Sequence, residues 1–321
     1  MDKIISHKIT AFGMQVSLTN YGASLQDLRL LSHDIPLVLG FPDAQDYAAQ
    51  TSHMGATAGR YANRIAAGKI TIDGHSYQLD QNEAGHHCLH GGSQGCGTRL
   101  WQLAAYDECS VTFTLDEADG HMGFPGAVHL RCQYQMIAPQ TLAITYHATT
   151  SAPTFVNLAH HSYFKLDDRD DNSGHELQIM ADHYLPVTAR NLPDGRQEPV
   201  AKTAFDFREM RPIGKQDYDH NFCLANRDIM RPIARLYSPY SGIEMQMDSD
   251  QAGLQFYTAH HLDEAARTHH GRAYRKSDGI CLEPQNWPNS PNMAQFPSSL
   301  LRPSETYHQR LILRFTDKGQ R

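Results

Sequence analysis

The sequence predicts an all-β fold of antiparallel strands, a sandwich or a barrel, with few short helices. Apolar and polar residues alternate with a period of two along many short segments, which is typical of strands with one face in a core and one in water. Turn signals recur between these segments at short intervals. A parallel sheet would need helices of about ten residues or more between its strands, and no such periodicity is present.

The first clear element is a hairpin at Asp73-Gly74, which lies between β-rich runs at 69–72 and 76–79. A second turn at Pro139-Gln140 returns one alternating segment to the next. No Pro-, Gly- or Ser-rich linker divides the chain, so residues 1–321 are expected to form a single domain with long loops. Alternating segments are expected as strands at 110–115, 128–136, 141–149, 243–248 and 310–315.

Composition and charge exclude several classes of protein. The net charge of −7 and the lack of a basic block make nucleic acid and anionic membranes poor partners. No run of about 18 apolar residues is present, so no transmembrane helix is expected. The first residues lack the apolar core of a secretory signal. The six cysteines show no C-x-x-C spacing, so reduced thiols and a cytoplasmic location are expected.

The stretch at 156–166 places His160, His161, Ser162 and Tyr163 between β-rich ends. Polar groups buried in this way need hydrogen-bond partners, or each costs about 1–3 kcal/mol. Taken alone, the stretch fits a packed core histidine as well as a functional one. The rest of the chain has to decide between these two interpretations.

Two glycine- and histidine-rich patterns invite other functions. The segment 91–95 matches G-x-S-x-G, but a nucleophile elbow needs a strand before it and a helix after it, and polar residues and glycines stand there instead. His86, His87 and His90 could bind a metal ion, but no Cys or carboxylate lies at ligand spacing. We therefore expect neither an esterase nor a metal site, and no cofactor motif is present.

The remaining polar groups suit a polyhydroxylated ligand. Asn63 and Arg64 place an amide beside a guanidinium, and both groups bind oxygen atoms. Glu283 ends a β-like run and precedes a proline, which is expected to turn the chain. Burial there would raise the pKa of Glu283 and make it a usable base near neutral pH. A His and a carboxylate without a cofactor indicate proton transfer on a sugar.

Together these stretches resemble the aldose 1-epimerases, or galactose mutarotases. The resemblance implies the large β-sandwich of the galactose mutarotase type, the supersandwich, and interconversion of the α and β anomers of aldohexoses such as D-galactose and D-glucose. It implies no cofactor and no metal. The motifs that carry it span nearly the whole chain, at 59–65, 89–92, 161–164, 184–187, 203–206, 219–224, 255–258 and 281–288.

The resemblance also implies catalytic roles. Glu283 corresponds to the general base of the family, His161 to its general acid, and His90 to a second histidine near the ring oxygen. The imidazole of His161 needs a nearby carboxylate to stay charged at neutral pH. His160 stands where the family often has Asn, and strand alternation predicts that its side chain faces away from the site.

The expected sugar ligands share side chains that can bind hydroxyl groups or line the same pocket. By correspondence with the family, or by adjacency to the acid, they are Asn63, Arg64, Ser162, Tyr163, Asp219 and Gln255.

Two alternatives within the fold stay open. A hexose-6-phosphate 1-epimerase would need extra cationic groups, for which Arg60, Arg64 and Arg99 are available. A non-catalytic sugar-binding protein would keep the binding residues and lack the acid or the base. A glycoside hydrolase would need two opposed carboxylates, and Asp219 and Glu283 are candidates for this pair. In such an enzyme, however, His161 would have no role. The preferred sugar, and the choice between a monomer and a homodimer, cannot be read from the sequence.

Overall fold

The structure is a computed structural model that describes residues 3–225, 227–266, 268–269 and 271–318. Within these residues the chain forms 26 strands and four short 3₁₀ helices, and no α-helix. The predicted all-β class with few short helices is confirmed. The 3₁₀ helices are η1 (Ala44–Ala48), η2 (Cys96–Thr98), η3 (His121–Gly123) and η4 (Ser290–Asn292).

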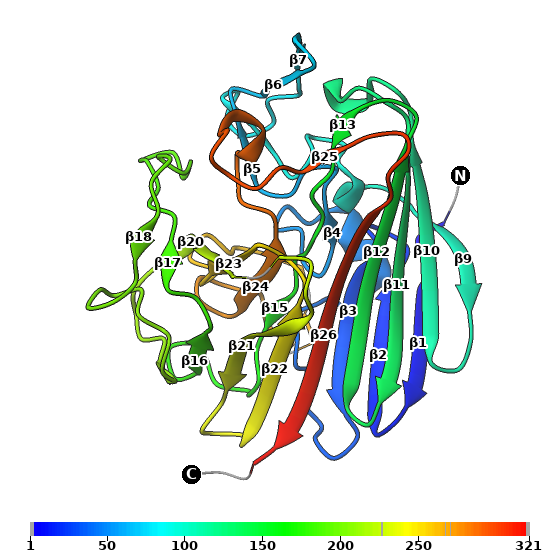
Figure 1. Ribbon diagram of the computed structural model, residues 1–321. Coiled ribbons are helices and arrows are strands. Elements are labelled where there is room, and N and C mark those ends of the chain that lie inside the picture. The colour runs from blue at the N-terminus through cyan, green and yellow to red at the C-terminus, as the bar shows by residue number, and fades with distance from the viewer. Residues whose placement is uncertain (1–2, 226, 267, 270, 319–321) are drawn as a thin grey trace.

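The largest sheet has nine antiparallel strands and contains all five of the alternating segments predicted as strands (Figure 1). Its C-terminal strand β26 lies in the middle of the sheet, between β12 and β22. In order, the strands are β19 (Arg211–Pro212), β16 (Glu176–Ile179), β21 (Arg231–Tyr237), β22 (Ile243–Ser249), β26 (Tyr307–Asp317), β12 (Thr141–Thr150), β11 (Val128–Ala138), β10 (Ser110–Glu117) and β9 (Gln102–Tyr106).

Two further sheets complete the main architecture. The first is formed by β1 (Ser6–Ala11), β2 (Met14–Thr19) and β3 (Ser24–Leu30). The second has six strands, in the order β15 (Tyr163–Phe164), β24 (Ile280–Gln285), β23 (Gly253–Tyr257), β20 (Asp219–Cys223), β17 (His183–Tyr184) and β18 (Glu198–Pro199).

Four strand pairs form small two-stranded sheets outside these three. The predicted hairpin at Asp73-Gly74 is one of them and is confirmed. The pairs are β13 (Thr154–Phe155) with β25 (Leu300–Leu301), β14 (Ala159–His160) with β4 (Thr57–Ala58), β5 (Arg64–Ala66) with β8 (His87–Leu89), and β6 (Lys69–Ile72) with β7 (His75–Gln78).

One apolar core joins the three main sheets. It contains Val16 of β2, Leu130 of β11 and Leu313 of β26, together with Phe256 and Leu282 of the six-stranded sheet. Alternation explains this placement, because every second residue of each strand faces the core. The opposite face of β20, β23 and β24 is therefore free to carry polar side chains.

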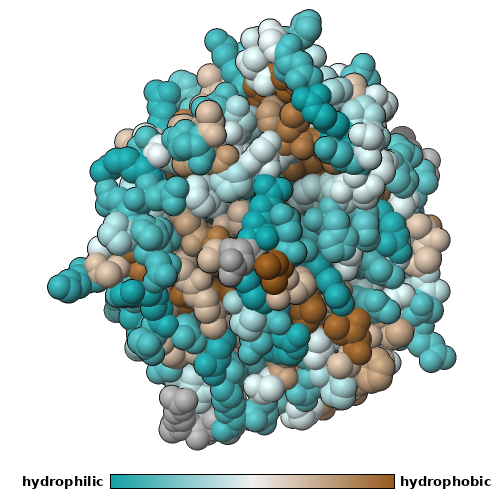
Figure 2. Space-filling model, in the orientation of Figure 1, coloured by the Kyte–Doolittle hydropathy of each residue, from teal (hydrophilic) through white to brown (hydrophobic). Residues whose placement is uncertain are grey.

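The face of the molecule in Figure 2 is mostly hydrophilic, and its hydrophobic side chains occur in small groups. Among the described residues, none of the helices has the length and apolar character needed to cross a membrane.

The expectation that Glu283 ends its strand is wrong. β24 continues through Pro284 to Gln285, and Pro284 pairs with Leu254 of β23. On its other side β24 pairs with β15 only at Ile280 and Cys281. A proline is tolerated in a strand at a position with one neighbouring strand, so the chain has no need to turn.

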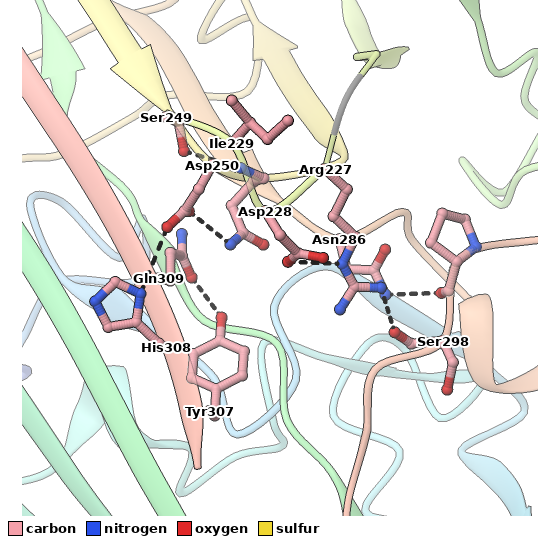
Figure 3. Close-up of polar contacts among 12 residues, drawn as sticks. Arg227, Asp228, Ile229, Ser249, Asp250, Asn286, Ser298, Tyr307, His308 and Gln309 are labelled. Atoms are coloured by element: carbon pink, nitrogen blue, oxygen red, sulfur yellow. Dashed lines mark hydrogen bonds and ion pairs between the residues drawn. The ribbon is translucent and has the colours of Figure 1, made fainter. Parts of the chain in front are cut away.

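Buried Gln309 of β26 braces the strand that carries Glu283. Its Nε2 donates to the carbonyl oxygen of Pro284 at 2.8 Å, and its Oε1 accepts from the hydroxyl of Tyr307. That hydroxyl accepts in turn from the backbone N–H of Leu158 at 3.1 Å, close to His161 in the chain. Figure 3 shows Tyr307 and Gln309 joined in this way on β26. The nine-stranded sheet thus holds both segments that carry the predicted acid and base.

Replacing Gln309 with leucine is expected to lower the free energy of unfolding by about 1–3 kcal/mol, because the carbonyl of Pro284 would be left buried without a donor. Urea denaturation followed by fluorescence measures this change. Gln135→Leu, at an exposed position of β11, is the matched control and should change stability by less than about 0.5 kcal/mol. Equal stability of the two variants would contradict the bracing role.

Candidate active site

A cavity of about 240 Å³ lies against the polar face of β20, β23 and β24. Seven of the nine predicted site residues line it. Its lining consists of Thr51, Ser52, His53, Asn63, Arg64, Leu89, His90, His161, Tyr163, Asp219, Tyr257, His261, Leu262, Asp263, Glu264 and Glu283.

Strand register brings the carboxylate side of the cavity together. Gln255 of β23 pairs with Glu283 of β24 on one side and with Asn221 of β20 on the other. Leu282 and Phe256, the adjacent residues, belong to the apolar core, so Glu283 and Gln255 must face the opposite way. Gln255 thus faces the same way as Tyr257, which lines the cavity.

His160 and His161 face opposite sides, as predicted. His160 is fully buried, and its Nε2 lies 2.7 Å from the hydroxyl of Ser162. His161 lines the cavity together with Tyr163, and their ring centroids lie 5.3 Å apart. The backbone of His161 is held by Ala56 and Gly55, through its N–H and its carbonyl respectively, at 2.9 Å each.

The expectation that Ser162 lines the cavity is therefore corrected. Alternation places Ser162 on the same side as His160, in the protein interior, and its side chain is fully buried there. Gln255 does not line the cavity either, but it contacts a residue that does. Its Nε2 donates to Oδ1 of Asp219 at 2.6 Å, so it orients this carboxylate.

The predicted acid and base lie next to each other. Nε2 of His161 is 3.8 Å from Oε1 of Glu283, and both side chains are more than nine-tenths buried. Burial, and then the Asp219 carboxylate, raise the pKa of Glu283 well above its usual value, while the guanidinium of Arg64 opposes this shift. Burial, and then the nearby imidazole of His53, lower the pKa of His161 to about 3.

These shifts favour a proton on the carboxyl group and none on the imidazole. The expectation that a nearby carboxylate keeps His161 charged is therefore not met in this structure. The desolvation of both groups outweighs their mutual attraction. With these shifts the two side chains together hold a single proton, which lies on the carboxyl group.

His90 and Asn63 hold each other in place beside this pair. The backbone N–H of Asn63 donates to Nδ1 of His90 at 3.2 Å, and the backbone N–H of His90 donates to the carbonyl of Asn63 at 3.1 Å. The ring of His90 meets that of His161 edge to face, with centroids 5.3 Å apart. Because Nδ1 of His90 is an acceptor, its proton lies on Nε2.

Arg64 is held by two carboxylates. Its Nε donates to both oxygens of Glu83 at 2.9 and 3.0 Å, and its Nη1 lies 3.6 Å from Oδ2 of Asp219. A planar guanidinium held on two sides has little freedom, so its position in the cavity wall is well defined.

Several cavity residues were not predicted from the sequence. His53 lies in the loop before β4, and His261, Asp263 and Glu264 lie in the loop after β23. Glu264 joins these loops, since its Oε1 accepts from the hydroxyl of Ser52 at 2.6 Å. The only sequence signal was that His261 directly follows another histidine, His260. Loop residues show no periodicity that would indicate the direction of their side chains.

Arg60 and Gly91 have structural roles outside the cavity lining. Nε of Arg60 donates to Oε2 of Glu117 at 2.8 Å, and both side chains are 1% exposed. A Cβ atom at Gly91 would lie 2.1 Å from the carbonyl oxygen of Gly59, and the φ of Gly91 is +87°. Glycine at position 91 thus permits the close approach of these two backbone segments. The close approach accounts for a glycine of the G-x-S-x-G pattern without a nucleophile.

Among the described residues, one group of metal-ligand side chains is compact: His161, Cys281 and Glu283, whose candidate atoms lie within 4.8 Å of one another. Burial raises the pKa of the Cys281 thiol well above its usual value. A cysteine binds a metal ion as its thiolate, the form that burial disfavours here.

Comparison with known proteins gives matches over nearly the whole chain. The family model for aldose 1-epimerase matches residues 6–314. The chain is 36% identical to the galactose mutarotase of Rattus norvegicus over 94% of its length and 91% of that protein. It is 34% identical to the aldose 1-epimerase of Escherichia coli K12 over 92% of its length and 90% of that protein. A crystal structure of an aldose epimerase homologue from C. elegans superposes with a TM-score of 0.93 at 28% identity, covering 99% and 100% of the two chains.

Proposed function

The chain belongs to the aldose 1-epimerase family of isomerases, and we propose that it interconverts the α and β anomers of a free aldohexose, with Glu283 as general base and His161 as general acid. The observation that carries this assignment is the 3.8 Å approach of Nε2 of His161 to Oε1 of Glu283 in the cavity wall. A base that accepts a proton and an acid that returns one can both work from this pair without a cofactor.

The proposed reaction conserves protons at each step. Glu283 takes the proton from the anomeric hydroxyl, and His161 gives one to the ring oxygen, so that the bond from C1 to the ring oxygen breaks and the aldehyde forms. The C1–C2 bond rotates, and the C5 hydroxyl attacks the other face of the carbonyl. The proton transfers then run in reverse and restore both groups.

The proton of the pair must move for this assignment to operate. In the structure, the pKa shifts favour the carboxyl group of Glu283 as its holder, and the reaction needs it on His161. The guanidinium of Arg64 favours the ionised carboxylate and so assists this transfer. Asn63, Arg64, Asp219 and Tyr163, together with His90, are the proposed contacts of the sugar, with Gln255 acting through Asp219.

The charges of the cavity favour a neutral sugar over a sugar phosphate. Among its described residues, Arg64 is the one guanidinium, and Glu83 and Asp219 already engage it. Arg60 lies in the protein interior, and Arg99 is not part of the lining. A phosphate would face the carboxyl groups of Asp263 and Glu264, and the part of the lining that the structure describes offers no free cation to bind it.

The direct test is polarimetry on freshly dissolved α-D-galactose and α-D-glucose, with the spontaneous rate subtracted. We expect the protein to accelerate the approach to anomeric equilibrium for at least one of them, and a faster rate with one sugar would define the preference. Uncatalysed rates for both sugars would refute the proposal. A D-glucose 6-phosphate rate above that of both free sugars would favour the phosphate epimerase instead.

The pair also predicts an unusual pH dependence. The active form holds one proton, and activity is lost when the pair binds a second proton or loses its only one. The pKa of His161 is lowered to about 3 and that of Glu283 is raised. The pH range in which the pair holds one proton is therefore wider, at both its acid and its alkaline end, than for a histidine and a glutamate with their usual pKa values. We therefore expect kcat/KM to stay level between about pH 5.5 and 7.5. A half-loss of activity on the alkaline side near pH 6.5 would indicate an ordinary histidine and contradict this account.

A further inference from the structure

His53 is held in the cavity wall by bonds on both sides of it in the chain. The preceding residue, Ser52, accepts from the hydroxyl of Tyr163 at 3.0 Å through its carbonyl and donates to Glu264 through its own hydroxyl. The carbonyl of His53 accepts from the N–H of Ala56 at 3.0 Å. Its φ of 52° is uncommon for a residue with a side chain, so the backbone direction at this position is specific.

The ring of His53 packs beside two histidines already placed in the site. Its centroid lies 4.8 Å from that of His90 and 6.2 Å from that of His161. The three imidazoles form one group in the cavity wall. Two positive charges at such distances repel each other, so the cluster as a whole disfavours protonation of His53 and His90.

The tautomer of His53 follows from its surroundings. Nδ1 is buried and has no hydrogen-bond partner among the described residues, and burial lowers the pKa of His53 to about 4. A proton on Nδ1 would be a buried donor without an acceptor, which is costly. The neutral ring therefore carries its proton on Nε2, and the His53 side chain lines the cavity. His90 has the same tautomer, because its Nδ1 accepts from Asn63.

We propose that His53 is a substrate-binding residue of the epimerase site, a neutral imidazole whose Nε2–H donates a hydrogen bond to a ring hydroxyl of the bound aldose. It would act beside His90, so that two neutral donors flank the acid His161. This inference rests on the proposed function. It adds a contact that requires no charge and therefore suits a neutral sugar.

His53→Phe tests the contact because phenylalanine keeps a ring and removes the donor. We expect kcat/KM for the preferred aldose to fall about three- to tenfold, mainly through KM, with an unchanged melting temperature. His53→Gln, whose amide nitrogen can occupy the place of Nε2, should recover part of the loss. His147→Phe is the control, since His147 forms a similar ring pair with His308, at 4.9 Å, and does not line the cavity.

Monodeoxy sugars make the test specific. With the 2-, 3-, 4- and 6-deoxy forms of the aldose, the ratio of wild-type to His53→Phe kcat/KM should fall to about one for the form that lacks the contacted hydroxyl and stay high for the others. A ratio near one for the parent sugar, or the same raised ratio for every deoxy form, would overturn the inference. If His53→Phe does not fold, His53→Met is read in the same way. Failure of the proposed function is distinguishable, because the wild-type protein itself would then show no turnover.

Discussion

Replacing Glu283 with glutamine is expected to lower kcat/KM for mutarotation by about 10²- to 10⁴-fold, while the sugar still binds. Glutamine keeps the shape and a carbonyl oxygen, but it cannot accept a proton at neutral pH. The remaining partner, His161, has a pKa of about 3 and would find no proton within the pair. His161→Gln should cause a loss of similar size, because the two groups share one proton across 3.8 Å.

Polarimetry measures the rate of each variant, and isothermal titration calorimetry on the inactive protein measures sugar affinity. Glu108→Gln in the exposed turn before β10 is the control and should retain wild-type kinetics. Turnover within about tenfold of wild type in Glu283→Gln would remove this residue from the role of base. A complete loss of binding together with activity would indicate damage to the cavity and would also contradict the assignment.

Arg60→Met is expected to lower the free energy of unfolding by about 3–5 kcal/mol, because it removes one partner of a buried ion pair. Arg60 donates to Glu117, and its Nη1 donates to the carbonyls of Pro125 and Gly126 at 3.1 and 3.0 Å. Methionine would leave the carboxylate of Glu117 buried, and Arg99, at 3.8 Å, would be its one remaining ion-pair partner among the residues that the structure describes. The cost of this unpaired charge dominates the expected change.

A double variant separates charge burial from lost packing. Arg60→Met combined with Glu117→Leu should recover at least about half of the lost stability, since two apolar side chains leave no buried charge. Arg302→Met is the control, because its ion pair with Asp73 is 43% and 54% exposed, and its loss should leave the stability close to that of the wild type. If Arg60→Met instead kept its stability and changed KM, then Arg60 would be a sugar ligand after all.

How far the sequence predicts this molecule depends on whether a residue lies in a periodic segment. Alternation correctly placed five of the nine strands of the large sheet and separated His161 from His160. The same rule, applied one residue further, would have placed Ser162 with His160 in the interior, away from the cavity. That error came from treating adjacency in sequence as adjacency in the pocket. Pro284 was misjudged because the number of strands beside β24 is a property of the sheet, which no local pattern reveals.

Strand alternation could not predict the cavity residues that lie in loops. His53 and Glu264 are 211 positions apart in the chain, and they meet only because the loops before β4 and after β23 fold over the same cavity. Arg60 and Arg64 look alike in the sequence, as two cations four positions apart. In the structure one is 1% exposed and pairs with Glu117, and the other lines the cavity. Burial decides whether an arginine forms an interior ion pair or lines the cavity, and burial depends on the tertiary structure.

The position of β26 has a consequence for biosynthesis. This strand ends at Asp317 and occupies the middle of the nine-stranded sheet, between β12 and β22. Among the strands of this sheet β26 is synthesised last, so a growing chain presents two long unpaired strand edges, those of β12 and β22, until β26 has been made. Such edges invite association with other nascent chains, and chaperones would be needed most during this interval. A premature stop before residue 307 would also remove Gln309, so even a soluble fragment that retained every catalytic side chain would lack the brace behind them.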